Sequence, residues 1–260
     1  MVEGQGLSLA ERARQGLSLS DELVIDAHAH IGVIKDYAIP QADAASLVRG
    51  MDRYGVDRAC IFGFAGVCSD YVYGNDEVIS AVSAFPDRFI GYATLNANYP
   101  EDLIAELERC FELGLRGIKL ITMYQGHPEE TERFEPVYAW AEKRRTIILS
   151  HQWGPPEFLA SLAGRYPSVC FHIGHLNPAY AHVARQYENI FTTTTFVPSP
   201  VAIVQAVEAF GVENILFGSD VPDLNVSLNI GPLLSAEISE VDKRAILGGN
   251  MARVLAEYIV

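Results

Sequence analysis

The chain has 260 residues, of which 49% are hydrophobic and 20% are charged. This length can bury a large core and lies in the range in which an α/β barrel forms a single domain. The net charge of −14 repels phosphate backbones and anionic lipid, so we expect neither a nucleic-acid partner nor a membrane partner. The same charge attracts cations, including divalent metal ions.

The four cysteines show no C-x-x-C spacing, and three of them fall inside predicted strands or helices. Both features argue against a disulfide framework and a cysteine zinc site, and they favour a reducing compartment. Residues 1–20 lack the unbroken apolar core of a signal peptide, and no later stretch is long and apolar enough to span a bilayer. We therefore expect a cytoplasmic protein.

Residues 1–22 are interpreted as an N-terminal extension or a short helix before the first strand. From residue 23 onward, apolar runs of strand length alternate with stretches of helical periodicity. The predicted strands are 23–28, 59–62, 88–95, 117–121, 146–150, 169–173, 190–196 and 215–217. The predicted helices between them are 43–54, 76–85, 101–113, 134–144, 156–165, 178–187 and 201–210, and at least two short helical patterns follow the last strand.

This alternation predicts the fold class. Eight strands, each followed by a helix and with no linker between them, indicate an α/β protein, a single-domain (β/α)8 TIM barrel over residues 23–260. Several strands are apolar runs, as expected where helices cover one side of a strand and the packed barrel interior covers the other. A doubly wound open sheet is the alternative, and the strand count argues against it.

Metal-binding side chains stand at the ends of several predicted strands, where barrel enzymes place their chemistry. His28 and His30 are two residues apart on the first strand, so both imidazoles point to one face. His151, His175 and Asp220 end the fifth, sixth and eighth strands. Alone, each of these residues is more often structural, but strand ends of one barrel converge on a common axis. Together they predict a site for zinc or another late divalent metal.

Six stretches then carry a resemblance to a known family: 25–30, 88–92, 114–120, 174–176, 218–222 and 249–253. They resemble the amidohydrolase superfamily, and within it the amidohydrolase-related branch that also contains non-oxidative decarboxylases. The stretches run through nearly the whole predicted barrel. They are specific as a family signature and say little about the substrate.

The resemblance implies a role for each residue at the strand ends. His28, His30 and His151 would hold one metal ion, with Asp220 as a further ligand or close neighbour. The ion would most simply be zinc, with manganese or a second metal as alternatives. A metal ion lowers the pKa of bound water toward neutrality, and Asp220 can accept the proton and pass it to a leaving group. His175 would polarise the substrate carbonyl or bind a second metal.

Lys119 bears on the number of metal ions. In two-metal members of the superfamily, a lysine on the fourth strand is carboxylated and bridges the ions, and Lys119 has the strand parity to face the interior. It lies two residues before the predicted strand end, deeper than a bridging ligand requires. The alternative is a lysine paired with an interior carboxylate, for which Asp26 is the candidate.

Three further residues are predicted to contact the substrate. Tyr124 and His127 lie in the loop after the fourth strand, and Trp153 follows the fifth. The aromatic members favour an apolar or ring-containing small molecule, although each could equally belong to the core. His172, whose parity is opposite to that of His175, is predicted to face the surrounding helices.

The loops around the mouth bear on the reaction. Recognition of a carboxylate usually uses arginine or lysine, and Lys35 is almost the only basic residue in these loops. The acidic residues there are Asp36, Asp70, Glu129, Glu130, Glu132, Glu157 and Asp223. An acidic mouth disfavours polyacids, so the sequence predicts hydrolysis of a neutral amide, ester or lactone. Decarboxylation of a small unsaturated or aromatic acid is the alternative, and the metal could still bind one carboxylate.

Two other classes stay open at this point. A non-catalytic barrel with a binding role is one, since a fold does not fix a function. A phosphate-binding barrel enzyme is the other, but no glycine-rich loop follows strands seven and eight. A homo-oligomer is compatible with the sequence, because dimers and tetramers are frequent among such barrels.

Overall fold

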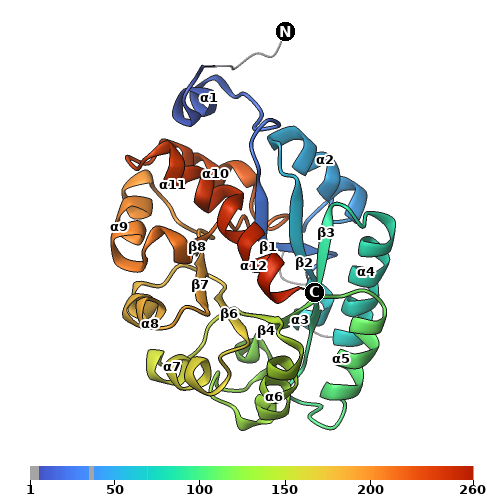
Figure 1. Cartoon of the computed structure of the whole chain (residues 1–260). Helices are drawn as coiled ribbons and strands as arrows, with labels where there is room; N and C mark the ends of the chain where they lie inside the picture. The colour runs from blue at the N-terminus through green and yellow to red at the C-terminus, as the bar shows by residue number, and fades with distance from the viewer. Residues whose placement is uncertain (1–5, 35–37, 69, 260) are drawn as a thin grey trace.

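The computed structural model describes residues 6–34, 38–68 and 70–259. Eight parallel strands form one sheet in sequence order, and helices surround them on the outside (Figure 1). The strands are β1 (Ile25–Ile31), β2 (Arg58–Gly63), β3 (Phe89–Thr94), β4 (Gly117–Leu120), β5 (Ile147–Ser150), β6 (Cys170–Ile173), β7 (Ile190–Thr193) and β8 (Ile215–Leu216).

One or more helices follow each of these strands, and a further helix precedes the first strand. They are α1 (Leu9–Gln15), α2 (Ala44–Tyr54), α3 (Phe64–Cys68), α4 (Tyr71–Ala84), α5 (Leu103–Glu112), α6 (Glu135–Arg144), α7 (Pro156–Arg165), α8 (Ala181–Gln186), α9 (Pro200–Phe210), α10 (Val226–Ser235), α11 (Glu240–Arg244) and α12 (Asn250–Tyr258). Among the described residues, no helix is long and apolar enough to cross a membrane.

Local sequence signals account for several helix ends. Asp43 accepts a hydrogen bond from the Ser46 N–H at the start of α2, and Gly55 ends that helix with φ 79°. Ser199 caps α9 in the same way, with proline at the first helical position. A capping side chain satisfies a backbone donor that the helix leaves free, and glycine adopts a left-handed conformation at little cost.

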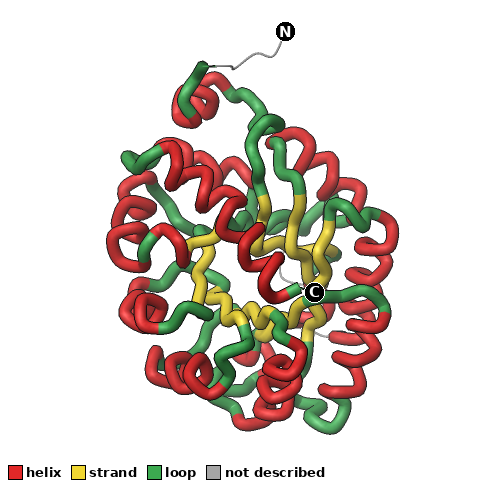
Figure 2. The backbone as a smooth tube through the Cα atoms, viewed as in Figure 1, coloured by secondary structure: helices red, strands yellow, loops and turns green. Residues whose placement is uncertain are grey.

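The sheet closes into a barrel between its first and last strands. The Ala27 N–H donates to the Phe217 carbonyl at 2.8 Å, and the Asp220 N–H donates to the His28 carbonyl at 2.8 Å. At the amino-terminal end of the barrel, α12 crosses the ring of strands (Figure 2) and packs apolar side chains against the interior. The predicted TIM barrel is confirmed, and its carboxyl-terminal end is left for the loops that carry the site.

A register shift in β1 between Asp26 and Ala29 sets the direction of the two histidines. Ala27, within the shifted segment, packs with the barrel interior, whereas Ala29 packs with the layer between strands and helices. Strict alternation would place both alanines on one side. The bulge inserts one residue into this pattern, so that His28 and His30 face the interior above Ala27.

His172 also faces the interior, which corrects the prediction from the sequence. Cys170 belongs to the interior cluster, and the His172 ring lies 5.8 Å from the ring of Phe191, another interior residue. The prediction assumed that side chains alternate between the two faces of the strand all the way from His172 to His175. The strand ends at Ile173, so the alternation does not continue to His175.

Gly117 in β4 tests how tightly the interior is packed. A Cβ atom there would lie 2.5 Å from Cε1 of Tyr92, whose ring is fully buried. We expect Gly117→Ala to lower the free energy of unfolding by about 1–3 kcal/mol, because overpacking forces buried groups to move. Gly50→Ala is the matched control: its Cβ would meet no atom within 4 Å, and alanine favours the α2 helix. Urea denaturation of both variants measures the difference, and equal midpoints would contradict the prediction.

Candidate metal centre

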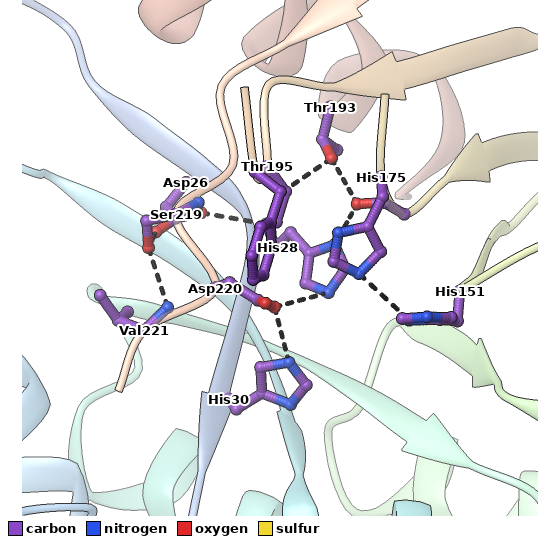
Figure 3. A network of polar contacts seen from close by, with 12 residues as sticks. Asp26, His28, His30, His151, His175, Thr193, Thr195, Ser219, Asp220 and Val221 are labelled. Carbon is purple, nitrogen blue, oxygen red and sulfur yellow. Dashed lines mark hydrogen bonds and ion pairs between the residues drawn. The ribbon is translucent and has the colours of Figure 1, made fainter. Parts of the chain in front are cut away.

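The structure brings the predicted strand-end residues together at the carboxyl-terminal end of the barrel (Figure 3). His28 and His30 come from β1, and His151 and His175 follow β5 and β6. Asp220 follows β8 and lies between the two β1 histidines in the network of contacts. All five side chains that the sequence singled out as ligands or catalysts therefore meet in one network.

The tautomer of His28 follows from its contacts. Its Nδ1 lies 2.7 Å from the carbonyl oxygen of Gly174, which can only accept a hydrogen bond. Nδ1 therefore carries the proton, and Nε2 of the neutral ring carries a lone pair. Burial lowers the pKa of His28 well below its ordinary value, and the charge of Lys119 adds to this effect. The neutral ring is thus the form that the site favours.

Asp220 faces both β1 histidines with the same oxygen. Oδ1 lies 3.2 Å from Nε2 of His28 and 2.9 Å from Nε2 of His30. Burial alone would raise the pKa of Asp220, but the hydrogen bond with His30 and the nearby histidines lower it overall. Asp220 is therefore a carboxylate.

This arrangement fits a cation. The lone pair on His28 Nε2 and the carboxylate oxygen of Asp220 face each other at 3.2 Å with no proton between them, and Nε2 has no hydrogen-bond partner among the described residues. Ligand atoms of His28, His175 and Asp220 all lie within 4.8 Å of one another. Two imidazoles and a carboxylate are a donor set that suits zinc and other late divalent ions.

His151 and His175 form a second pair in the same network. Nε2 of His175 lies 3.1 Å from Nδ1 of His151, so one proton is shared between the two rings. Burial lowers the pKa of His151 to about 3 and that of His175 to about 4. Both rings are therefore neutral, and a neutral imidazole can offer a lone pair to a metal ion.

Further hydrogen bonds hold the backbone and side chains that adjoin the candidate ligands. The Gly174 carbonyl that fixes His28 also accepts from Oγ1 of Thr193, which pairs with Thr195. On the other side, Asp26 accepts from both the N–H and the hydroxyl of Ser219. Contacts of this kind orient ligands and tune their basicity. The sequence did not single out Thr193, Thr195 or Ser219, although the run of four threonines from residue 192 was a visible signal.

Lys119 lies buried in the interior and does not pair with Asp26. Its Nζ lies 4.2 Å from the centre of the Phe62 ring and has no hydrogen-bond partner among the described residues. Burial lowers the pKa of Lys119 to about 7. The expected lysine–carboxylate pair is therefore wrong, since both oxygens of Asp26 are taken up by Ser219 and the His28 backbone.

A cavity of about 290 Å³ opens beside the candidate metal ligands His30, His151, His175 and Asp220. Aromatic and aliphatic side chains form most of its wall, and none of its described lining residues is lysine or arginine. The lining residues are His30, Ile34, Phe64, Val67, Ile121, Tyr124, His151, His175, Phe196, Asp220 and Asp223. Tyr124 thus lines the cavity, in agreement with its predicted position beside the substrate. Phe196 had not been singled out, and Lys35 and Asp36 fall outside the described residues.

The other two predicted substrate contacts lie outside the cavity. Trp153 is only 1% exposed, packs edge-on against Phe171 and donates through Nε1 to the His172 carbonyl. His127 lies in the loop after β4, and its Nε2 lies 3.0 Å from Oδ1 of Asn98. Trp153 belongs to the core because its loop folds back against the outer side of β6.

Comparison with known proteins agrees with this geometry. Residues 25–256 match the sequence profile of the amidohydrolase family, so the chain belongs to that family of enzymes. A 2-amino-3-carboxymuconate-6-semialdehyde decarboxylase from Dictyostelium discoideum is 26% identical over 234 residues, which cover 70% of this chain and 65% of that protein. The chain therefore spans about two thirds of the length of this relative.

Solved structures of similar fold include two further decarboxylases. The 5-carboxyvanillate decarboxylase of Novosphingobium aromaticivorans, in complex with manganese, gives a TM-score of 0.74 at 16% identity, over 92% of this chain and 97% of the other. The 2,6-dihydroxybenzoate decarboxylase from Rhizobium gives 0.71 at 18% identity, over 90% and 99%. At these identities the structures establish a shared fold.

Proposed function

We propose that the chain is a metal-dependent, non-oxidative decarboxylase of a small aromatic or unsaturated carboxylic acid. The observation that carries the proposal is the Asp220 carboxylate, which lines an aromatic-walled cavity and faces the unprotonated Nε2 of the buried His28. The hydrolase reading drawn from loop charges is replaced as the first choice, because the named relatives are decarboxylases.

We assign His28, His30, His151 and Asp220 as the ligands of one divalent ion, which we take to be manganese or zinc. The ion would supply positive charge that holds a substrate carboxylate or a neighbouring oxygen and stabilises the electron pair released when the carbon–carbon bond breaks. His28 and Asp220 present the two donor atoms with no proton between them. The assignment of His151 over His175 as the remaining ligand follows the family resemblance.

His175 is assigned to proton transfer. When the bond to the carboxyl carbon breaks and carbon dioxide leaves, the electron pair left on the substrate carbon must take up one proton. His175 lines the cavity, and its Nε2 is 3.1 Å from Nδ1 of His151, so a proton that this pair takes up from solvent in each turnover can be passed to that carbon. A positioned acid of this kind contributes about 10²–10⁴-fold to a rate.

The cavity wall supports a substrate with one ring and one carboxylate. Phe64, Tyr124 and Phe196 offer flat apolar surfaces, and a volume of about 290 Å³ holds a single small ring. The described wall offers no lysine or arginine for a second carboxylate. The same feature supports the second candidate, hydrolysis of a neutral amide, ester or lactone, in which Asp220 would take the proton of the attacking water.

The test separates the two reactions. Purified protein loaded with manganese is incubated with hydroxybenzoates and unsaturated monoacids in one series, and with esters, lactones and amides in the other. We expect release of carbon dioxide and one equivalent of the decarboxylated product in the first series only, with loss of turnover after chelation. Turnover confined to the second series would overturn the decarboxylase and favour the hydrolase. A protein that retains no stoichiometric manganese and turns over neither series would favour a non-catalytic binding protein.

We also propose a cytoplasmic location and a homo-oligomeric state. Cys60, Cys110 and Cys170 are buried free thiols, as a reducing compartment allows. Sedimentation of the purified protein would determine the oligomeric state.

A further inference from the structure

Two residues at the mouth of the site adopt a backbone conformation that their side chains disfavour. Phe196 follows β7 with φ 65°, and Asp220 follows β8 with φ 60°. Of the other described residues except glycine, only Arg145, at the end of α6, has a positive φ. Side chains with a Cβ are strained in this region, most of all bulky ones, so surrounding contacts must hold Phe196 there.

One buried side chain contacts the backbone at both places. Asn229 of α10 is 1% exposed. Its Oδ1 accepts a hydrogen bond from the Phe196 N–H at 2.9 Å, and its Nδ2 donates to the carbonyl of Ser219, directly before Asp220, at 2.7 Å. The amide therefore spans the loops after β7 and β8 with both of its polar atoms in use.

Each loop presents a different part of the site. Asp220 offers the carboxylate that faces His28 and His30. The Phe196 ring lies 5.7 Å from the ring of His175 and forms part of the cavity wall, yet it is 59% exposed. A ring so exposed gains little from packing, which leaves the backbone contact to Asn229 as a main restraint on its position.

We propose that Asn229 is a positioning residue that fixes the Asp220 turn and the Phe196 wall as one unit. The amide aligns the carboxylate for the metal ion and holds the aromatic wall above His175. The strength of metal binding and the fit of a ring-bearing substrate then depend on the same side chain. The inference rests on the metal site of the proposed function and is independent of the reaction that the site performs.

The first test measures metal affinity in the absence of substrate. Asn229→Ala removes both hydrogen bonds, and Asn229→Leu removes them while filling the space. Contacts that orient metal ligands are worth about 10–100-fold in affinity, so we expect manganese binding to weaken at least about tenfold in both variants, measured by competition with a chelator. Asn225→Ala is the matched control, because Asn225 caps the same helix and its side chain accepts from Ser227 and Tyr54 rather than contacting Phe196 or Ser219.

A merely structural role for Asn229 would give a different result. All variants are measured well below their unfolding temperatures, where a loss of stability alone leaves the affinity of folded protein unchanged. Affinity within twofold of wild type in the folded Asn229 variants would overturn the proposal, as would an equal loss in Asn225→Ala. If one Asn229 variant does not fold, the other decides.

A second readout concerns the aromatic wall. Phe196→Ala removes the ring and leaves Asn229 in contact with the Asp220 turn, so we expect KM for a ring-bearing substrate to rise while metal affinity stays within twofold. Adding Asn229→Ala to this variant should weaken metal binding, and with the metal site kept filled by saturating manganese it should cause no further rise in KM, since the two residues act on the substrate through one wall. Fully additive effects on KM would contradict the coupling. Failure to find any turnover would count against the proposed function and leave the affinity test intact.

Discussion

His28→Ala is expected to lose stoichiometric metal binding and at least about 1000-fold in turnover, because the ion supplies several kcal/mol of charge stabilisation and each 1.36 kcal/mol is tenfold in rate. The reason lies in the direction of one lone pair. Nδ1 of His28 donates its proton to the Gly174 carbonyl, so the lone pair on Nε2 points toward the Asp220 carboxylate. A cation can bind between these two donor atoms. Elemental analysis of the purified variant, together with its turnover on the best monoacid, measures both effects.

His172→Ala is the matched control for that variant. His172 is an equally buried interior histidine, but its ring lies against Phe191, and neither of its ring nitrogens has a hydrogen-bond partner among the described residues. We expect it to keep one equivalent of metal while losing stability through the cavity that it leaves. Equal metal contents in the two variants would contradict the assignment of His28. Two equivalents in the wild type would return Lys119 to consideration as a carboxylated ligand.

The barrel itself could be predicted from sequence because its signals are local. Eight apolar runs of strand length and the periodicities between them depend on neighbours a few residues away. The start of α4 could not be predicted from the sequence, because Tyr71–Asn75 combines aromatic, polar and glycine residues with no amphipathic stripe. Its first turn forms where Asp70 caps it and where Gly74 packs against the α3 backbone, a contact invisible in a linear pattern.

The bulge in β1 and the end of β6 show why parity arguments fail near the site. Both depend on hydrogen bonds from neighbouring strands, and a shift of one residue turns every later side chain to the other face. His172 was misplaced for this reason. His28 and His30 were placed together correctly, because the alternation holds from His28 to His30 although His28 lies within the shifted segment, and both rings lie against the interior residue Phe62.

The clustering of the candidate metal ligands could be predicted from the sequence, whereas the residues around them could not. Ligand-type side chains at strand ends stand out in sequence because apolar residues are expected there. Asn229 lies on a helix that follows the last strand and reaches the site only through the tertiary packing of α10. The preference for hydrolysis came from counting charges in loops, and few of those acidic residues line the cavity.

Asp220→Asn is expected to weaken metal binding at least about 100-fold, beyond the range for residues that only orient ligands. The substitution removes the negative charge that faces His28 and His30 while keeping the shape of the side chain. Asparagine also tolerates the φ of 60° at this position better than most residues. The protein should therefore fold normally, which separates a loss of the site from a loss of the barrel.

Two further variants serve as controls for Asp220→Asn. Asp223→Asn removes the same charge from the wall of the same cavity, and we expect metal affinity within a few-fold of wild type, because the carboxylate oxygen that faces both His28 and His30 belongs to Asp220. Asp220→Ala should lose metal as Asp220→Asn does and should also unfold more easily, by about 1–2 kcal/mol, because alanine is strained in the left-handed region. A folded Asp220→Asn protein that binds manganese as tightly as Asp223→Asn would show that charge at Asp220 does not hold the ion. The histidines alone would then have to account for the site.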